Sequence, residues 1–297
     1  MAVDYYWLFA LLAPAFFAVS NVIDNHVLHS RMRDPVSYNI LTTWPTLPMA
    51  LLILAARPVS LAFGAWFVGT AVGFVFAFLF VLYTTAMMRE EGTNVVSVLY
   101  TSPLFVAVLA SIFLGERLSG LNYAGIGLLV LSAFLILYRR IGSGNLVLGA
   151  MVVYALGSAV ARVAAKSALE NVDIWSYFFW FLIGGVIGTA ILAMIWRRRL
   201  SATLRRLDAG TSTLVLATSC ISTIGLVFLY TSFSLGSVAI ASGLTAIQPM
   251  VVFLFTSVLV RFRPGAIPLE RLTGRWAYAR KVGAALLIVL GAFALAE

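Results

Sequence analysis

The sequence has few charged residues and few of the residues that build catalytic or metal centres. Only 10% of its 297 residues are charged, against roughly 25% in a soluble domain. A single cysteine, Cys220, excludes an intramolecular disulfide and a thiolate metal site. The only two histidines, His26 and His29, form a weak metal pattern, and no Walker-type glycine loop occurs. We therefore expect no metal, no cofactor, no ATP hydrolysis and no enzymatic activity.

Apolar residues are abundant instead. They make up 62% of the chain, the mean hydropathy is +1.02, and runs long enough to cross a hydrocarbon core of about 30 Å recur throughout. No Lys or Arg precedes the first run, so we interpret it as the first span rather than a cleaved signal. The net charge of +9 fits basic loops of a membrane protein, and we expect no nucleic-acid partner.

Charge and turn clusters divide the chain into ten apolar segments, which predict an all-α membrane protein with ten transmembrane helices. The predicted spans are 5–28, 36–56, 61–88, 93–114, 121–138, 146–169, 175–196, 213–235, 238–260 and 282–296.

Four sequence landmarks occur twice in the same order. The pairs are Asp34 with Asp173, Tyr83 with Tyr230, Pro103 with Pro249, and Glu116 with Glu270. Residues 1–141 and 142–297 are therefore interpreted as two homologous five-helix repeats. Because five is odd, the second repeat must enter the membrane inverted, which is the plan of many secondary transporters with a substrate site near the midplane.

One stretch of the first half resembles a known family. Ser102-Pro103-Leu104-Phe105 is followed by Phe113-Leu114-Gly115-Glu116-Arg117-Leu118, and this is similar to the EamA-type, ten-helix branch of the drug/metabolite transporter superfamily. The resemblance covers essentially the whole chain, although the second half departs from it at residues 258–262. It implies transport of amino acids, other metabolites, nucleotide sugars, drugs or lipid-linked groups, and it does not name the substrate.

The basic residues predict an orientation in the inner (plasma) membrane. Most of the 20 Lys and Arg residues lie in or beside the odd-numbered loops between spans. The positive-inside rule then places these loops in the cytoplasm and both termini outside. Members of the resembling family are usually drawn the other way round.

Ionisable residues within spans are expensive and are candidate functional residues. Asp24 shares a helix face with Asn21, and it can bind a cationic group or a proton, or lie hydrated at the interface. Arg162 and Lys166 can bind a carboxylate or phosphate. The alternative is that they extend to the lipid headgroups, or that Lys166 forms a structural pair with Glu170. Positions along their spans place Asp24 and Arg162 about 20 Å apart, in two opposite vestibules.

A cavity wall is expected to be aromatic and weakly polar, since rings bind apolar and cationic groups. Together with Asn21, Asp24 and Arg162, the predicted substrate-binding residues are Trp44, Tyr83, Asn94, Tyr100, Trp180, Tyr230 and Gln248. The alternative for any one aromatic residue is simple packing between helices. Ser102 and Gln248 each precede a proline, which frees a backbone carbonyl one turn earlier.

Two functions remain open. The first is a secondary transporter that exports an amino acid or related amphipathic compound by alternating access through a cavity between the halves. The alternative is a flippase for a lipid or lipid-linked phosphate compound, suggested by the Arg-rich side. In either case the partners are a small-molecule substrate and the lipid bilayer, and the protein is a monomer or homodimer.

Overall fold

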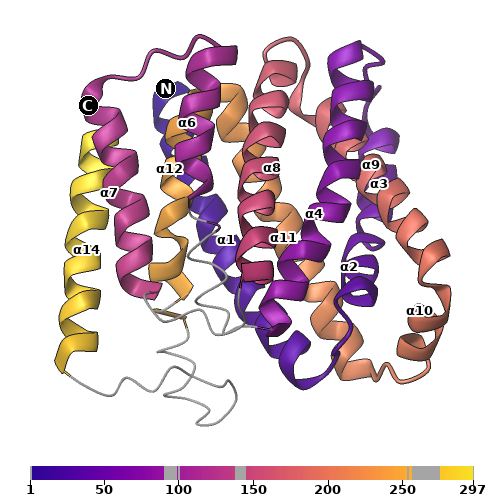
Figure 1. Cartoon of the computed structure of the whole chain (residues 1–297). Helices are drawn as coiled ribbons and strands as arrows, with labels where there is room; N and C mark the ends of the chain where they lie inside the picture. The colour runs from indigo at the N-terminus through magenta and orange to yellow at the C-terminus, as the bar shows by residue number, and fades with distance from the viewer. Residues whose placement is uncertain are drawn as a thin grey trace.

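The structure, a computed structural model, describes residues 2–89, 99, 101–137, 145–252, 254–255 and 275–296, and this part of the chain is helical with loops (Figure 1). The first half contains α1 (Ala2–Ser30), α2 (Pro35–Thr43), α3 (Thr46–Ala56), a π-helical turn (Gly64–Val68) that leads into α4 (Gly69–Arg89), α6 (Ser102–Phe113) and α7 (Gly120–Leu137). The second half contains α8 (Asn145–Leu169), α9 (Ile174–Ile195), α10 (Arg197–Leu204), α11 (Ala209–Leu235), α12 (Val238–Leu244) and α14 (Arg275–Ala296).

Six helical segments are long and apolar enough to cross a membrane, and four shorter apolar helices accompany them among the described residues. Each of the ten predicted spans overlaps one of these segments. The multi-pass, all-helical class is therefore confirmed, while the ten-span inverted repeat stays a prediction.

The outer face of the bundle is apolar. Leu52, Phe113 and Phe293 are each at least 70% exposed, and similar side chains occur on most of the long helices. Soluble monomers rarely expose apolar patches beyond a few hundred Å². This surface is suited to lipid tails.

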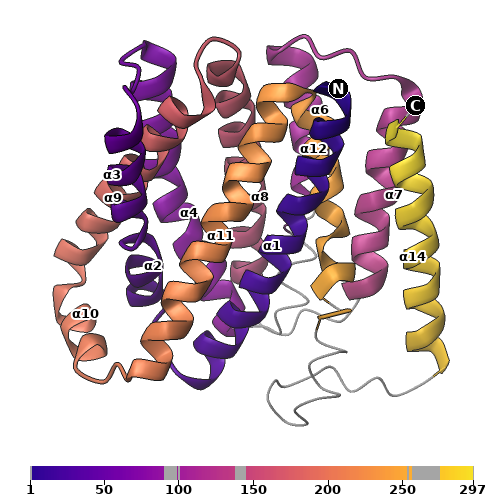
Figure 2. The ribbon, with the colours of Figure 1, turned by 180° about the vertical axis from the view of Figure 1, so that it is seen from behind.

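Three helix pairs form the most extensive contacts: α1 with α11, α4 with α9, and α7 with α14. Figure 2 shows α1 and α11 side by side, and the outer pair α7 and α14 at the edge of the bundle. The N-terminal end of α1 and the C-terminal end of α14 lie at the same end (Figure 1).

Glycines allow two of these pairs to approach closely. A Cβ at Gly73 would lie 1.9 Å from the backbone oxygen of Phe181, and one at Gly184 would lie 2.1 Å from that of Thr70. Without side chains at these positions the α4 and α9 backbones touch. Because lipid tails are as apolar as the helix surfaces, the hydrophobic effect does not hold helices together in a membrane, and these close dispersion contacts do so instead. Gly125 and Gly291 do the same between α7 and α14.

Prolines explain two interruptions. The predicted second span is broken at Trp44-Pro45, because Pro45 lacks the N–H that would continue the helix. Before Pro249, residues Thr245–Ile247 tighten into a 3-10 turn for the same reason. By contrast, α1 continues through Pro14.

One element is not in the predicted set. Residues Arg197–Leu204 were expected to form a loop, but they form α10, a short helix packed against α2 and α9 at one end of the bundle (Figure 1).

Candidate functional site

A cavity of about 260 Å³ lies inside the bundle. Its lining side chains come from α1, α2, α3, α4, α6, α8, α9 and α11 and from the turn before Pro249. Both predicted halves therefore contribute to one internal space.

Asp24 is the acid in this wall, and hydroxyl groups from two neighbouring helices hold it. Its Oδ1 accepts hydrogen bonds from the hydroxyls of Tyr38 on α2 and Thr218 on α11, the latter at 2.6 Å. The Thr218 hydroxyl also lies 3.2 Å from that of Ser20, one turn before Asp24. Asp24 is only 3% exposed, so these hydroxyls replace water around a carboxylate within a span.

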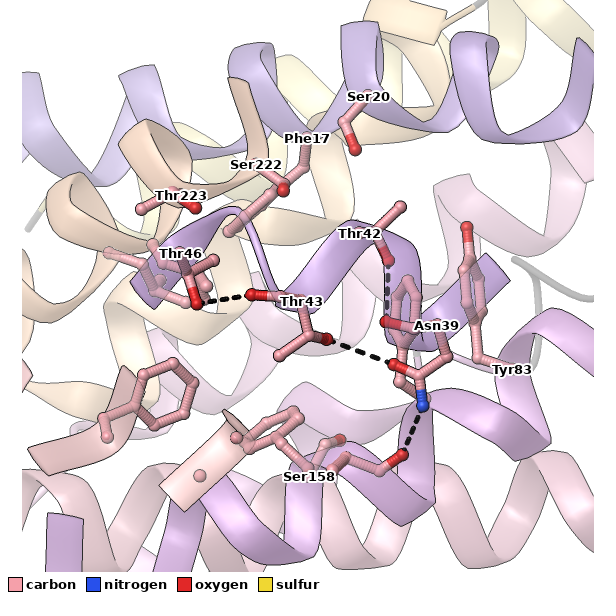
Figure 3. A pocket seen from close by; sticks show the side chains of 18 of the residues that line it. Phe17, Ser20, Asn39, Thr42, Thr43, Thr46, Tyr83, Ser158, Ser222 and Thr223 are labelled. Atoms are coloured by element: carbon pink, nitrogen blue, oxygen red, sulfur yellow. Dashed lines mark hydrogen bonds between the residues drawn. The ribbon is translucent and has the colours of Figure 1, made fainter. Parts of the chain in front are cut away.

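A ladder of polar groups follows α2 into α3 along the cavity (Figure 3). The Thr46 hydroxyl donates to the backbone oxygen of Thr43 at 2.6 Å, and the Thr43 hydroxyl donates to Oδ1 of Asn39 at 3.4 Å. The Asn39 amide donates to the backbone oxygen of Ala77 on α4 at 2.6 Å. Asn39, Thr43 and Thr46 all line the cavity, and the two hydroxyl oxygens keep lone pairs that can accept hydrogen bonds from a polar solute.

Arg162 on α8 is the base in the wall of the same cavity. Lys166, one turn later, does not line it. Its ammonium donates to the backbone oxygen of Phe233 at 2.9 Å and lies 3.9 Å from the Glu170 carboxylate. Lys166 therefore forms the structural pair with Glu170.

Aromatic rings supply much of the remaining surface. Tyr83 and Tyr154 lie on one part of the wall with centroids 5.9 Å apart, and Phe181 and Tyr230 lie on another with centroids 5.3 Å apart. Such faces bind apolar groups and cations.

The predicted site residues divide into three groups. Those that line the cavity are Asn21, Asp24, Tyr83, Arg162, Tyr230 and Gln248. Two are elsewhere: Trp44 is 42% exposed at the helix break, and the Trp180 ring N–H donates to the backbone oxygen of Ser60 at 3.0 Å. Asn94 and Tyr100 lie outside the described residues.

Two predicted wall residues contact each other. The Tyr83 hydroxyl donates to Oδ1 of Asn21 at 3.0 Å, which joins α4 to α1.

The expectation that Asp24 and Arg162 occupy separate vestibules is wrong, because one cavity reaches both. That expectation used only their positions along two helices. It ignored the short hydroxyl-bearing residues, such as Thr43 and Ser222, that line the space between the helices.

Hydrogen bonds join the loops at the end of the bundle near both termini. Glu116, after α6, accepts hydrogen bonds from the Ser237 hydroxyl at 2.7 Å and the Val238 backbone N–H at 2.8 Å. It thereby caps the first turn of α12 in the other half, where a negative charge is favourable.

Asp173 caps α9 at the same end. Partial burial raises the pKa of its carboxyl, but hydrogen bonds from the Ser176 side chain and from the backbone N–H groups of Ser176 and Trp175, with the charge of Arg57, outweigh burial and lower it overall. The charged cap is therefore the stable form.

Comparison with known proteins gives a family match for the first part of the chain. Residues 5–138 match the family described as "EamA-like transporter family". This part of the chain is an EamA-like domain. Together with the apolar helices, this match supports a multi-pass membrane transporter of the drug/metabolite type.

No curated protein matches the chain. A solved structure described as "Crystal structure of protein" is 17% identical and has a TM-score of 0.70, over 99% of this chain and 95% of that one. The likeness shows a shared fold that extends beyond the EamA-like domain to nearly the whole chain.

Proposed function

We propose that the protein is a secondary transporter of a small zwitterionic metabolite, an amino acid or a related amphipathic compound. The substrate binds in the central cavity, and the two halves exchange shapes to open it to either side of the membrane in turn.

The observation that carries the proposal is the presence of an acid and a base in one small cavity. An ammonium group pairs with Asp24, and a carboxylate pairs with the guanidinium of Arg162, which presents a planar fork of donors. Aromatic faces receive the apolar part of the solute. A volume of about 260 Å³ lies below the range of about 300–1,000 Å³ for drug-sized ligands, which favours a small metabolite.

Residues at matching positions of the two proposed repeats line the same cavity. Tyr83 and its counterpart Tyr230 both line the cavity, as do Ser102 and its counterpart Gln248. These matches support the division into residues 1–141 and 142–297.

The helix contacts also support an inverted repeat. Exchanging the halves maps the α1–α11 contact onto the α8–α4 contact, and both pairs pack together. The equivalent helices α7 and α14 pack against each other, as do the α2–α3 segment and α9. This arrangement is expected when two inverted halves enclose a site between them.

The proposed orientation follows the charges. The C-terminal ends of α1 and α4 and the whole of α10 lie at the end of the bundle opposite the termini (Figure 1). Arg31 and Arg33 follow α1, Arg89 is the last residue of α4, and α10 begins with Arg197, Arg198 and Arg199. The positive-inside rule makes this the cytoplasmic end.

The proposal is tested by thermal unfolding of the purified protein with amino acids, quaternary amines, nucleotide sugars and lipid headgroups. A ligand at 100 times its Kd stabilises the folded state by about 2.7 kcal/mol. We expect a zwitterion to raise the unfolding midpoint. Asp24→Asn and Arg162→Gln should each weaken its affinity about 10- to 150-fold, the value of one charged hydrogen bond.

Glu170→Gln is the matched control, because Glu170 is half exposed and outside the cavity. The proposal is wrong if no amine- or carboxylate-bearing compound shifts the midpoint, or if the control weakens binding as much as Asp24→Asn does.

A further inference from the structure

Helix α10 and the two residues that follow it carry a basic groove that is separate from the cavity. The groove is lined by Arg197, Arg198, Ser201, Ala202, Arg205 and Arg206, and none of these lines the central cavity. Four arginine residues thus line one shallow surface groove.

The bundle holds this groove in place. Leu200 is buried in a cluster with Val36, Ile40 and Leu192 on α2 and α9, and Trp196 packs against the same cluster. One face of α10 is therefore fixed by apolar contacts, and the four arginines are exposed.

The nearest acids serve other groups. Asp34 accepts hydrogen bonds from the hydroxyls of Ser37 at 2.6 Å and Thr203 at 3.4 Å. Asp208 accepts from Thr211 at the start of α11 and lies 3.5 Å from Arg31. Among the described residues, no acid lines the groove.

The groove lies where the apolar surface ends. Met194 and Ile195, the last residues of α9, are 67% and 61% exposed, and Leu204 at the end of α10 is 48% exposed. An exposed apolar surface beside exposed arginines, with Trp196 between them, is the pattern of the boundary between acyl chains and headgroups.

We propose that this groove is a binding site for the phosphodiester headgroup of an anionic phospholipid, whose acyl chains lie along the exposed end of α9. Arginine forks pair with phosphate oxygens by two parallel hydrogen bonds, and the Ser201 hydroxyl is a further donor. The lipid is a bound partner that fixes the basic end at the membrane surface, and it is not the transported solute, because the groove and the cavity share no residue.

The test measures lipid binding by the purified full-length protein in neutral detergent. Phosphatidylglycerol and phosphatidylcholine of equal chain length are titrated, and retained lipid is counted by native mass spectrometry. Arg198→Gln and Arg205→Gln remove one groove charge each. Arg199→Gln is the matched control, because Arg199 is an exposed arginine of the same helix that does not line the groove.

We expect phosphatidylglycerol to bind in preference to phosphatidylcholine. Each groove variant should weaken its affinity about fivefold, the value of one basic residue near an anionic surface, and Arg199→Gln should change it by less than about twofold. Equal binding of the two lipids, equal loss in Arg199→Gln, or full competition by inorganic phosphate at millimolar concentration would each overturn the lipid site. The result is independent of the transported substrate, so it stands or falls separately from the proposed function.

Discussion

Replacing Gly184 with alanine tests whether direct backbone contact between α4 and α9 holds the bundle together. The new Cβ would lie 2.1 Å from the backbone oxygen of Thr70, whereas Cβ atoms essentially never come closer than 3.0 Å. The helices must therefore separate by about 0.9 Å at this point. A gap of about 0.5–1 Å forfeits a quarter to a half of each dispersion contact that it affects.

Overpacking of this kind costs about 1–3 kcal/mol, and the better helix propensity of alanine offsets up to about 1 kcal/mol of it. We expect Gly184→Ala to lower the free energy of unfolding by about 1–2 kcal/mol. Gly127→Ala on α7 is the matched control, because a Cβ there meets no atom within 4 Å. That variant should be neutral or slightly stabilising.

The assay is thermal unfolding in detergent followed by tryptophan fluorescence, at one fixed scan rate because membrane-protein unfolding is commonly irreversible. The reasoning is refuted if Gly184→Ala unfolds at the wild-type temperature, or if Gly127→Ala is destabilised to the same extent.

Three further variants test the polar contacts. Thr218→Val removes the hydroxyl that donates to Asp24, and we expect it to lower the free energy of unfolding by about 1–2 kcal/mol. In a double-mutant cycle with Asp24→Asn, additive effects of the two substitutions would contradict this contact. Glu116→Gln removes the charge that caps α12, and we expect a loss of about 1–2 kcal/mol, which an unchanged unfolding midpoint would contradict. The lowered pKa of Asp173 implies that its cap stabilises the protein above the unfolded pKa of about 3.9 and that this contribution is lost as pH falls below that value toward the folded pKa. Asp173→Asn should therefore reduce the dependence of the unfolding midpoint on pH below about 4, and an identical dependence would contradict this account.

The order of the helices follows from the sequence because length and hydropathy decide which segments can cross a membrane. The predicted segments 146–169 and 175–196 differ from α8 and α9 by one residue at each shifted end. Helix α10 was missed because its mean polarity is high. The spacing of Trp196, Leu200 and Leu204 at four-residue intervals is the signal that predicts it.

The cavity could be predicted only in part. Tyr83, Tyr230 and Gln248 stand out as polar or aromatic residues at repeated landmarks, whereas Asn39 and Thr218 look like ordinary polar residues of apolar helices. Their contacts with Ala77 and Asp24 join segments far apart in the chain, and helix periodicity carries no information on such contacts. Trp44 and Trp180 are predicted from their ring type alone, which does not distinguish a cavity wall from a helix end or from a ring that is hydrogen-bonded to a loop.

The central claim is that one cavity binds and carries a zwitterionic solute, and counterflow into proteoliposomes tests it most directly. Vesicles are loaded with the unlabelled compound that gives the largest thermal shift, and exchange of external labelled compound is followed. The account predicts rapid exchange by the wild type and by Glu170→Gln, with at least tenfold slower exchange by Asp24→Asn and Arg162→Gln at substrate concentrations below Kd. Wild-type exchange rates in both cavity variants, with all four proteins folded, would contradict it.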